Sequence, residues 1–257
     1  MINSANDADS FIKEVQAISA VDPFACRIIS LCNSYKPDLV FVDYWLVQND
    51  SGKNTGAIAR NGSNFILFLT DDSDIEEISS FMRIAGASAV ICDGKYQLDF
   101  TGGKTLEGKV LVKAEAFDDE DDLSFIEPDI KSAYELIQKS ADKNFVPPNF
   151  EDFYVDVNHK LRHNTSRLLG IEENGVPAAV AMTVAESNNA AVLGAVSCDP
   201  EYRRRGFGSS LIKHITNILV GEKKSVYLHR AENDNVEFYK NLGFTEYGSW
   251  REYYSIR

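Results

Sequence analysis

Several features that define whole classes of protein are missing from this sequence. No two of its cysteines form a C-x-x-C pair or a zinc-site spacing, so we expect reduced, mostly buried thiols. The N-terminal stretch from Met1 to Ser10 is polar and acidic, and it lacks the basic and apolar regions of a secretory signal. Together these absences predict a cytoplasmic protein. The cysteines are Cys26, Cys32, Cys92 and Cys198.

Long apolar runs and an excess of basic residues are also missing. The longest nearly apolar stretch, Val176 to Ala185, is about half of what a bilayer span requires, so we expect no membrane contact. The formal net charge is -13, which argues against a nucleic-acid partner because such binding needs a basic surface. An acidic surface is compatible with a cationic substrate such as an amine, and equally with solubility alone. The length of 257 residues is enough for one large or two medium domains.

One basic, glycine-containing turn stands out in this acidic chain. An apolar run with strand character ends at Cys198, and Pro200 stops it because proline cannot donate to a ladder. From Phe207 onward, apolar side chains recur every three or four residues, which predicts a helix over 206–219. The basic and flexible residues between strand and helix are Arg203, Arg204, Arg205, Gly206 and Gly208.

Such a turn is suited to an anion. The first N–H groups of a helix have no partners, and the helix dipole is positive there. Gly206 and Gly208 lack a Cβ atom, so a phosphate can approach backbone N–H groups over residues 204–209. The alternative is a surface turn with solvated arginines. A Rossmann fingerprint is excluded because it needs a glycine at Leu211, and Gly102-Gly103-Lys104-Thr105 is no P-loop because the required earlier glycine is Leu98.

At this point the sequence resembles a family. The pattern Arg203-x-x-Gly206-x-Gly208 is similar to the Q/R-x-x-G-x-G/A signature of the GNAT superfamily of N-acetyltransferases. Further on, Phe238-Tyr239 followed by Leu242-Gly243-Phe244 is similar to that family's Tyr-x-x-x-Gly-Phe element. One position departs from the pattern: the usual asparagine seven residues before the tyrosine is Glu232, and Asn233 and Asn235 lie nearby. The resemblance covers Asp129 to the end of the chain.

The resemblance implies an α/β (α+β) GNAT fold, which is a mixed twisted sheet with flanking helices. It also implies acetyl-CoA as the co-substrate, with no metal. The turn would hold the pyrophosphate, and the preceding strand would pair with the pantetheine arm and offer one N–H to the oxyanion. The residues expected at the coenzyme are Val196, Ser197, Cys198, Arg203, Arg204, Arg205, Gly206, Phe207, Gly208, Ser209 and Asn235.

The expected catalytic residue is Tyr239, at the position of the family's usual general acid. A tyrosine ordinarily has a pKa of about 10, so it stays protonated at neutral pH and can donate a proton to the leaving thiolate. Its alternative role is a packed aromatic beside Phe238. The general base is left open between Glu186 and His229. We expect no nucleophilic role for Cys198, because direct transfer needs no covalent intermediate.

These expectations lead to two hypotheses of function. The first is an N-acetyltransferase that moves an acetyl group from acetyl-CoA to a primary amine of a small molecule or peptide by direct attack. The second is a non-catalytic module that binds coenzyme A and regulates, with an N-terminal domain that recognises a partner. The sequence leaves the acceptor amine and the oligomeric state open.

The N-terminal half repeats the order of elements that is expected in the C-terminal half. A hairpin over 55–70, a helix over 74–85 and a strand over 89–92 correspond to the strands over 167–198, the helix over 206–219 and the strand over 225–228. We therefore predict a degenerate GNAT-like or other α/β domain over residues 1–122 and a GNAT acetyltransferase domain over 123–257. The acidic run at 118–122 is the expected linker.

The first domain should not bind coenzyme A. Where the second domain has arginines and glycines, the first has Asp71-Asp72-Ser73-Asp74, and an acidic turn repels phosphate. We also expect a strand around 39–47, strands that end near Phe100 and begin near Val110, and a final strand over 250–256.

Helices are expected over 9–18, 129–140 and 150–161, the last capped by Asn149. The resemblance implies that the last two of these helices wall the acceptor site. On the last helix, His159 and His163 stand at a metal-ligand spacing, but no third ligand lies nearby in the sequence, so we expect surface histidines there.

Overall fold

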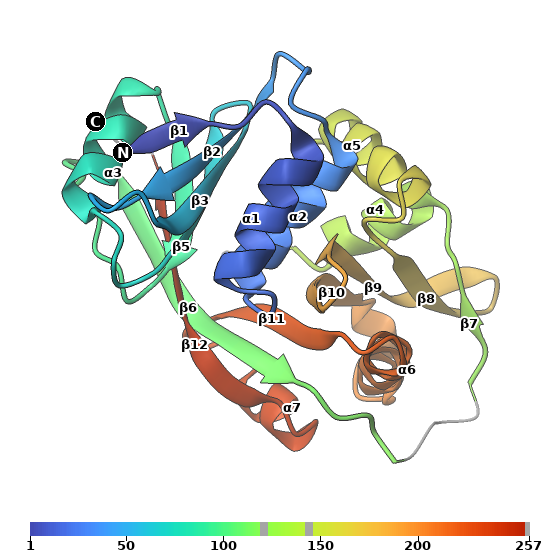
Figure 1. Ribbon diagram of the computed structural model, residues 1–257. Coiled ribbons are helices and arrows are strands. Elements are labelled where there is room, and N and C mark those ends of the chain that lie inside the picture. The colour runs from blue at the N-terminus through green and yellow to red at the C-terminus, as the bar shows by residue number, and fades with distance from the viewer. Residues whose placement is uncertain (119–122, 142–145, 255–257) are drawn as a thin grey trace. The chain divides into compact units, whose positions relative to one another are not determined.

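The structure of the protein is a computed structural model that describes residues 1–118, 123–141 and 146–254 (Figure 1). The chain divides into two units that are not separated by a single cut. Unit 1 comprises Met1–Leu111, His229–Asp234 and Glu246–Arg257, and unit 2 comprises Val112–Leu228 and Asn235–Thr245. The domain boundary expected near residue 122 stays a prediction, because residues 119–122 of the acidic run lie outside the described residues.

Unit 1 begins with a short strand, two helices and an antiparallel meander. Its strand order is β1-β2-β3-β4-β5-β12-β6, in which β4 and β5 are parallel. Strand β12 comes from the end of the chain and pairs antiparallel with β5, so that Trp250 faces Asp93 and Tyr254 faces Ala89. The elements are β1 (Ile2–Ser4), α1 (Ala8–Ile18), α2 (Pro23–Ser34), β2 (Val42–Gln48), β3 (Asn54–Asn61), β4 (Asn64–Leu69), α3 (Ile75–Ile84), β5 (Ala89–Asp93), β6 (Lys104–Lys113) and β12 (Thr245–Tyr254).

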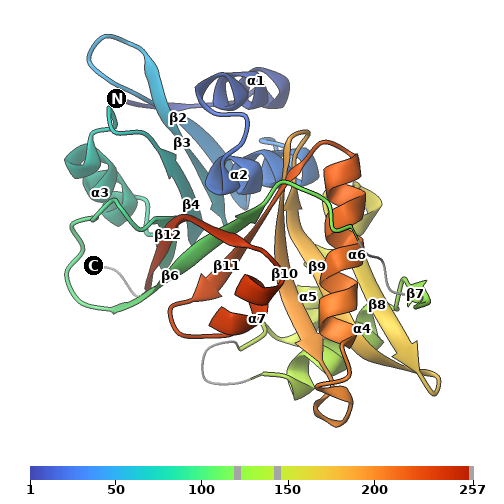
Figure 2. The same cartoon turned by 90° about the horizontal axis from the view of Figure 1, so that it is seen from below.

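Unit 2 contains the helix that was expected to bind the anion. Its strand order is β11-β10-β9-β8-β7, in which β10 and β11 are parallel and the other neighbours are antiparallel. Helix α6 lies along strands β8, β9 and β10 (Figure 2). The elements are β7 (Phe125–Ile126), α4 (Ile130–Lys139), α5 (Phe150–Arg162), β8 (Leu168–Glu173), β9 (Val176–Glu186), β10 (Ala190–Cys198), a 3-10 turn (Pro200–Tyr202), α6 (Phe207–Gly221), β11 (Ser225–Ala231) and α7 (Val236–Asn241).

The same order of elements therefore occurs twice. Each unit has a short strand, two helices, three antiparallel strands, a helix, and a strand parallel to the one before that helix. The expectation of one architecture in tandem is confirmed at this level. Aspartate and asparagine side chains explain where helices α1 to α5 begin, because each accepts a hydrogen bond from a first-turn N–H. These capping residues are Asp7, Asp22, Asp74, Asp129 and Asn149.

Two strand expectations were wrong in part. The strand expected around 39–47 begins only at Val42, which pairs with Asn61, the last residue of β3, so residues 39–41 have no strand partner in that ladder. They form a turn instead, and Val40 is 95% exposed. Within the described residues no strand ends near Phe100, because the chain from residue 94 to 103 runs as turns and coil. The other expected strand of that pair exists, but it begins at Lys104 rather than near Val110.

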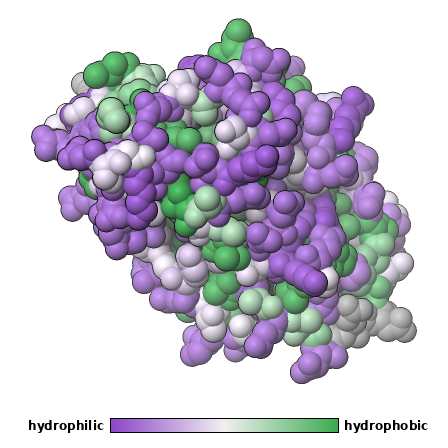
Figure 3. Space-filling view, viewed as in Figure 1, coloured by the Kyte–Doolittle hydropathy of each residue, from purple (hydrophilic) through white to green (hydrophobic). Residues whose placement is uncertain are grey.

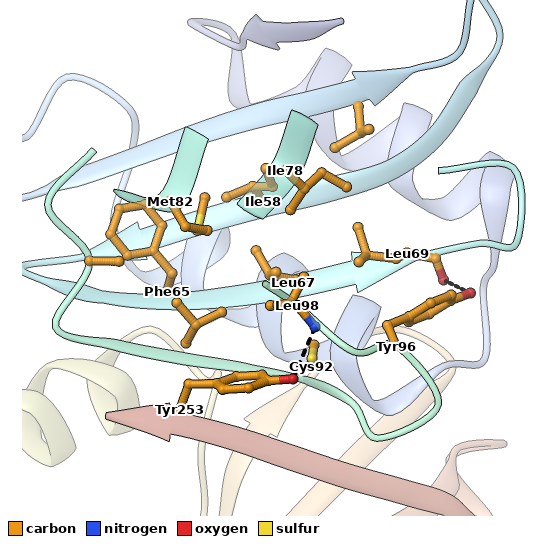
Figure 4. Close-up of a cluster of buried hydrophobic side chains, with 13 residues drawn as sticks. Ile58, Phe65, Leu67, Leu69, Ile78, Met82, Cys92, Tyr96, Leu98 and Tyr253 are labelled. Carbon is orange, nitrogen blue, oxygen red and sulfur yellow. Dashed lines mark hydrogen bonds between the residues drawn. The ribbon is translucent and has the colours of Figure 1, made fainter. Parts of the chain in front are cut away.

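Part of that coil completes the core of unit 1, as Figure 4 shows. Tyr96 and Leu98 are buried against strands β3 to β5 and helix α3. The Tyr96 hydroxyl donates to the Leu69 carbonyl at 3.2 Å, and the Leu98 N–H donates to the Tyr253 hydroxyl at 3.0 Å. The segment after β5 is therefore fixed to β4 and to β12 by buried hydrogen bonds.

Hydrophilic side chains predominate on the face drawn in Figure 3, as the net charge of -13 leads one to expect. Among the described residues, no helix has both the length and the apolar character needed to cross a membrane.

Replacing Tyr253 by phenylalanine tests the buried hydrogen bond in unit 1. The change leaves the Leu98 N–H buried without an acceptor, so we expect the free energy of unfolding to fall by about 1–3 kcal/mol in urea denaturation. Tyr154→Phe is the matched control, because Tyr154 is 42% exposed, and its effect should stay within about 0.5 kcal/mol. Equal effects of the two changes would contradict the role given to Tyr253.

Candidate functional site

The turn between β10 and α6 leaves a helix N-terminus open. Arg204 and Gly206 both adopt left-handed backbone conformations, with φ of 64° and 87°, and α6 begins at the next residue, Phe207. Its N-cap residue, Gly206, has no side chain to accept a capping hydrogen bond, whereas the N-cap side chains of helices α1 to α5 all accept one. A Cβ atom on Gly206 would meet nothing within 4 Å, so the space beside the residue that precedes α6 is open. The first N–H groups of α6 are thus available to an external acceptor.

The three arginines of the turn differ in what they contact. Arg203 donates from Nε to the Cys198 carbonyl at 3.3 Å. Arg205 pairs with Glu173 at 2.9 Å, and its guanidinium also lies over two aromatic rings of the turn. Arg204 is exposed and has no hydrogen bond or ion pair with any of the described residues. Of the three, Arg204 is therefore the cation that is left for a ligand, while Arg203 and Arg205 hold the turn.

Helix α7 lies against the open end of α6. A Cβ atom on Gly208 would be 3.8 Å from Cζ of Phe238, so the first turn of α6 and the helix that carries Tyr239 are neighbours. The Tyr239 ring is half-buried and contacts Phe238 and Phe244, with centroids 5.1 Å and 5.9 Å apart. Gly243 follows the C-cap residue Leu242 and ends the helix with a left-handed φ of 73°.

The other residues expected at the coenzyme take different positions around the turn. The Phe207 side chain is 7% exposed and belongs to the core between α6 and the sheet, so only its backbone faces the opening. Ser209 is half-buried in the first turn of α6. Asn235 is exposed, has a φ of 51° and precedes α7, with no side-chain capping bond.

Strand β10 contains a bulge at its middle. Gly194 pairs with Met182 and Ser197 with Val180, so two residues of β10, Ala195 and Val196, face a single residue of β9. Ala195 has a φ of 48°, which is uncommon for a residue with a side chain. The parallel pairing with β11 ends at Leu193, although β10 goes on to Cys198. The bulge therefore reorients the peptide groups beside Val196, one of the residues expected to meet the pantetheine arm.

Ser197 and Cys198 have less freedom. Both pair with β9, and the Cys198 carbonyl accepts from Arg203 and from the Ser140 hydroxyl at 3.2 Å. Burial raises the pKa of the Cys198 thiol, which supports an unreactive cysteine.

Glu186, one of the two candidates for a general base, is buried in an ion-pair network. Its carboxylate lies 3.0 Å from Arg167 and 2.7 Å from Lys224, and it accepts from the Thr183 hydroxyl at 2.7 Å. Its side chain is 3% exposed. These partners occupy the carboxylate oxygens, so the geometry favours a structural role over proton abstraction.

His229, the other candidate, belongs to unit 1. Its Nδ1 lies 3.4 Å from Nη1 of Arg27, and because an arginine only donates, Nδ1 accepts and the ring proton sits on Nε2. Burial and then the Arg27 charge hold the pKa of His229 well below its ordinary value. In this tautomer neither ring nitrogen is left to take a proton from an amine.

The two histidines at the end of α5 lie against each other. The rings of His159 and His163 stack with centroids 4.1 Å apart, and Nδ1 of His163 lies 2.9 Å from the His159 carbonyl oxygen. Among residues 1–118, 123–141 and 146–254, no group of three or more His, Cys, Asp or Glu side chains is arranged to hold a metal ion.

The corresponding corner of unit 1 is closed. Between β4 and α3, the Asp74 side chain caps the helix by accepting from the Glu77 N–H at 2.9 Å. Oδ1 of Asp71 lies 2.9 Å from Nζ of Lys95 and 3.1 Å from the Tyr96 hydroxyl. Hydrogen bonds from Lys95 and then Tyr96 hold the pKa of Asp71 below its ordinary value, so it stays charged. The pairing of β3 with β4 has no bulge. The acidic turn that the sequence shows thus coincides with a capped helix and a regular strand.

Several contacts that shape the open turn cannot be predicted from the sequence. Glu173 of β8 pairs with Arg205, and Lys139 and Ser140 at the end of α4 contact Asp199 and Cys198. These pairs join residues far apart in the chain, and no local pattern marks them. The bulge did leave a signal, because Gly194 lies next to it: a Cβ atom there would come within 2.5 Å of Val184.

Comparison with known proteins agrees with this geometry. Residues 130–244 match the Acetyltransferase (GNAT) family. The probable N-acetyltransferase san of Drosophila melanogaster is 31% identical over 115 residues, which are 42% of this chain and 61% of that protein. The chain thus matches about three fifths of the length of this relative.

Solved structures show the fold of the whole chain. A tandem GNAT protein from the clavulanic acid biosynthesis pathway superposes with a TM-score of 0.56 at 13% identity, over 100% of this chain and 98% of that one. A GNAT-family acetyltransferase from Colwellia psychrerythraea superposes with a TM-score of 0.57 at 11% identity, over 99% of each chain. At such low identity the likeness concerns the fold alone. It confirms the expected α/β GNAT fold, including the tandem arrangement.

Replacing Glu186 by glutamine tests whether its carboxylate has a structural role or acts as a general base. The change leaves Arg167 and Lys224 beside a neutral group, so we expect the free energy of unfolding to fall by about 3 kcal/mol in urea denaturation. The pH dependence of any turnover should stay as in the unchanged protein. A stable variant whose pH profile loses its acidic limb would instead make Glu186 the base.

Proposed function

We propose that this protein is an N-acetyltransferase that moves an acetyl group from acetyl-CoA to a primary amine; the match of residues 130–244 to the Acetyltransferase (GNAT) family supports this. The observation that carries the proposal is the uncapped N-terminus of α6 beside the helix that bears Tyr239. One feature suits a diphosphate, and the other is a neighbouring helix that carries a phenol. The name of the matched relative agrees with transfer to nitrogen.

In this proposal the first turn of α6 binds the pyrophosphate of acetyl-CoA. The N–H groups from Gly206 to Ser209 are the donors, and the helix dipole favours the negative charge. Arg204 adds a full positive charge, since it has no competing partner in the described chain. Arg203 and Arg205 act through the shape of the turn, because their guanidinium groups are already engaged.

The bulged part of β10 would receive the pantetheine arm and the thioester. An extended arm can add to a strand edge through main-chain hydrogen bonds. The pairing of β10 with β11 ends at Leu193, so the rest of β10 offers such an edge. A backbone N–H near Val196 would polarise the thioester carbonyl and stabilise the negative charge that develops on its oxygen. The proposed coenzyme-binding residues are those expected from the sequence. Phe207 would contribute only its backbone, and Arg203 and Arg205 would shape the turn without contacting the phosphates.

The chemistry then requires one attack and one proton transfer. The amine lone pair attacks the thioester carbon, the C–S bond breaks, and the sulfur leaves as a thiolate that takes the proton of the Tyr239 hydroxyl. The nitrogen gives up its extra proton to solvent, and solvent returns a proton to the Tyr239 oxygen. Since the geometry disfavours both Glu186 and His229 as a base, the amine would bind in its neutral form or lose its proton to water.

Unit 1 would take no coenzyme in this proposal, so each chain would bind one acetyl-CoA. The support is the closed corner, where aspartates and their partners occupy the place that the glycines leave open in unit 2. The acceptor would be a small molecule or peptide with a primary amine, and a cytoplasmic location remains a prediction.

The direct test is thiol release from acetyl-CoA with a panel of primary amines, polyamines and peptides. We expect release with at least one amine, and Tyr239→Phe should lower kcat by about 100-fold or more while the Kd for acetyl-CoA is unchanged. Unchanged turnover in Tyr239→Phe would remove the acid assignment. Tight binding of acetyl-CoA with no release for any amine would favour a regulatory coenzyme-binding module.

A charge reversal at Arg204 tests the binding turn. Arg204→Glu places a negative charge beside the pyrophosphate, so the Kd for coenzyme A in calorimetry should rise by about 10-fold or more. Arg162→Glu is the matched control, because Arg162 is exposed at the end of α5 and the net charge changes equally. Similar affinities in both variants would contradict a site at this turn.

A further inference from the structure

The C-terminal end of α4 contacts the two residues that lead into the binding turn. Lys139 Nζ lies 3.2 Å from Oδ2 of Asp199, and the Ser140 hydroxyl donates to the Cys198 carbonyl at 3.2 Å. Lys139 is the last residue of α4, and Ser140 is its C-cap. Neither contact follows from the signature of the turn, which begins only at Arg203.

Asp199, at the start of the turn, is held by several hydrogen bonds and an ion pair. Its backbone N–H donates to Ala178 of β9 at 2.9 Å, and its Oδ1 accepts from the Glu201 N–H at 3.0 Å. The Tyr202 N–H donates to its carbonyl at 2.9 Å. The bond from Glu201, followed by the contact with Lys139, holds the pKa of Asp199 below its ordinary value. Asp199, which is 8% exposed, thus contacts β9 through its backbone N–H, and the 3-10 turn and α4 through its carboxylate.

Beyond Asp199 the backbone enters its two left-handed positions, at Arg204 and Gly206. The direction of the first N–H groups of α6 therefore depends on the position of Asp199 and on the backbone path from Asp199 to Phe207. A change of the Asp199 side chain that rotates the 3-10 turn would move those N–H groups relative to a bound diphosphate.

We propose that Lys139 and Ser140 are positioning residues that hold the start of the turn, so that α6 presents its N-terminus correctly to the diphosphate part of the donor. This inference rests on the proposed function. It also links α4, one of the two helices of unit 2 that precede β8, to the affinity for the donor. Lys139 acts here through Asp199 and not as a direct partner of the phosphates.

The test compares two donors that differ in the diphosphate. Acetyl-CoA carries it, and S-acetylpantetheine does not. In the double variant Lys139→Met with Ser140→Ala, we expect kcat/KM for acetyl-CoA to fall by about 5-fold or more, while kcat/KM for S-acetylpantetheine stays within about 2-fold. Lys139→Arg, which keeps the ion pair, should restore the value for acetyl-CoA. If the role were purely structural, kcat/KM would fall equally for the two donors, and this result would overturn the proposal.

Asp199→Asn separates positioning from simple attraction. If Lys139 only attracted the phosphates, removing the Asp199 charge would tighten the binding of coenzyme A. If Lys139 acts through Asp199, the same change weakens it, and we expect a Kd about 3-fold to 10-fold higher in calorimetry. Lys131→Met is the control for loss of a positive charge on α4, because Lys131 is exposed near the other end of that helix, and its Kd should be unchanged.

The outcomes also distinguish this inference from the proposed function. An unchanged protein that binds no coenzyme A would refute the proposed function and this inference with it. An unchanged protein that binds coenzyme A, together with an Asp199→Asn variant that binds it as tightly or more tightly, would refute only the positioning role. Calorimetry with coenzyme A and with pantetheine gives the same comparison if no amine in the panel is acetylated.

Discussion

The uncapped first turn of α6 is the constraint on which the arrangement of unit 2 depends. Helices α1 to α5 each begin with an aspartate or asparagine whose side chain accepts from the first turn, a contact typically worth about 1 kcal/mol. Helix α6 gives up that contact at Gly206. Its turn is held instead from outside, by Glu173 on Arg205 and by Lys139 and Ser140 on the residues before it.

The two units show what one architecture does with and without such an opening. In unit 1 the strand before the helix runs without a bulge, and Asp74 caps the helix. The segment after β5 adds Tyr96, whose hydroxyl lies within reach of both Leu69 and Asp71. In unit 2 these closing contacts are replaced by the bulge, the glycines and Arg204, which has no partner among the residues that the structure describes. The difference lies in side chains and local backbone, while the order of elements is the same.

Much of this follows from sequence because it is local. The run from Cys198 to Phe207, the glycine that ends α7 and the acidic corner of unit 1 are each set by neighbouring residues. Leu39 to Phe41 favours a strand, but β3 ends opposite Val42, so the run stays a turn. The roles of Glu186 and His229 likewise depend on Arg167, Lys224 and Arg27, which are distant in the chain. Tertiary partners, not local pattern, decide those positions.

The most direct measurement of the central claim is an amide chemical-shift titration of the whole chain with coenzyme A. If the open end of α6 binds the diphosphate, the N–H signals from Gly206 to Ser209 will shift and saturate at one equivalent. The N–H signals from Asp71 to Asp74 in the corresponding corner of unit 1 will stay unchanged. Saturable binding that leaves the signals of Gly206 to Ser209 in place, or that shifts those of Asp71 to Asp74 instead, would contradict the account.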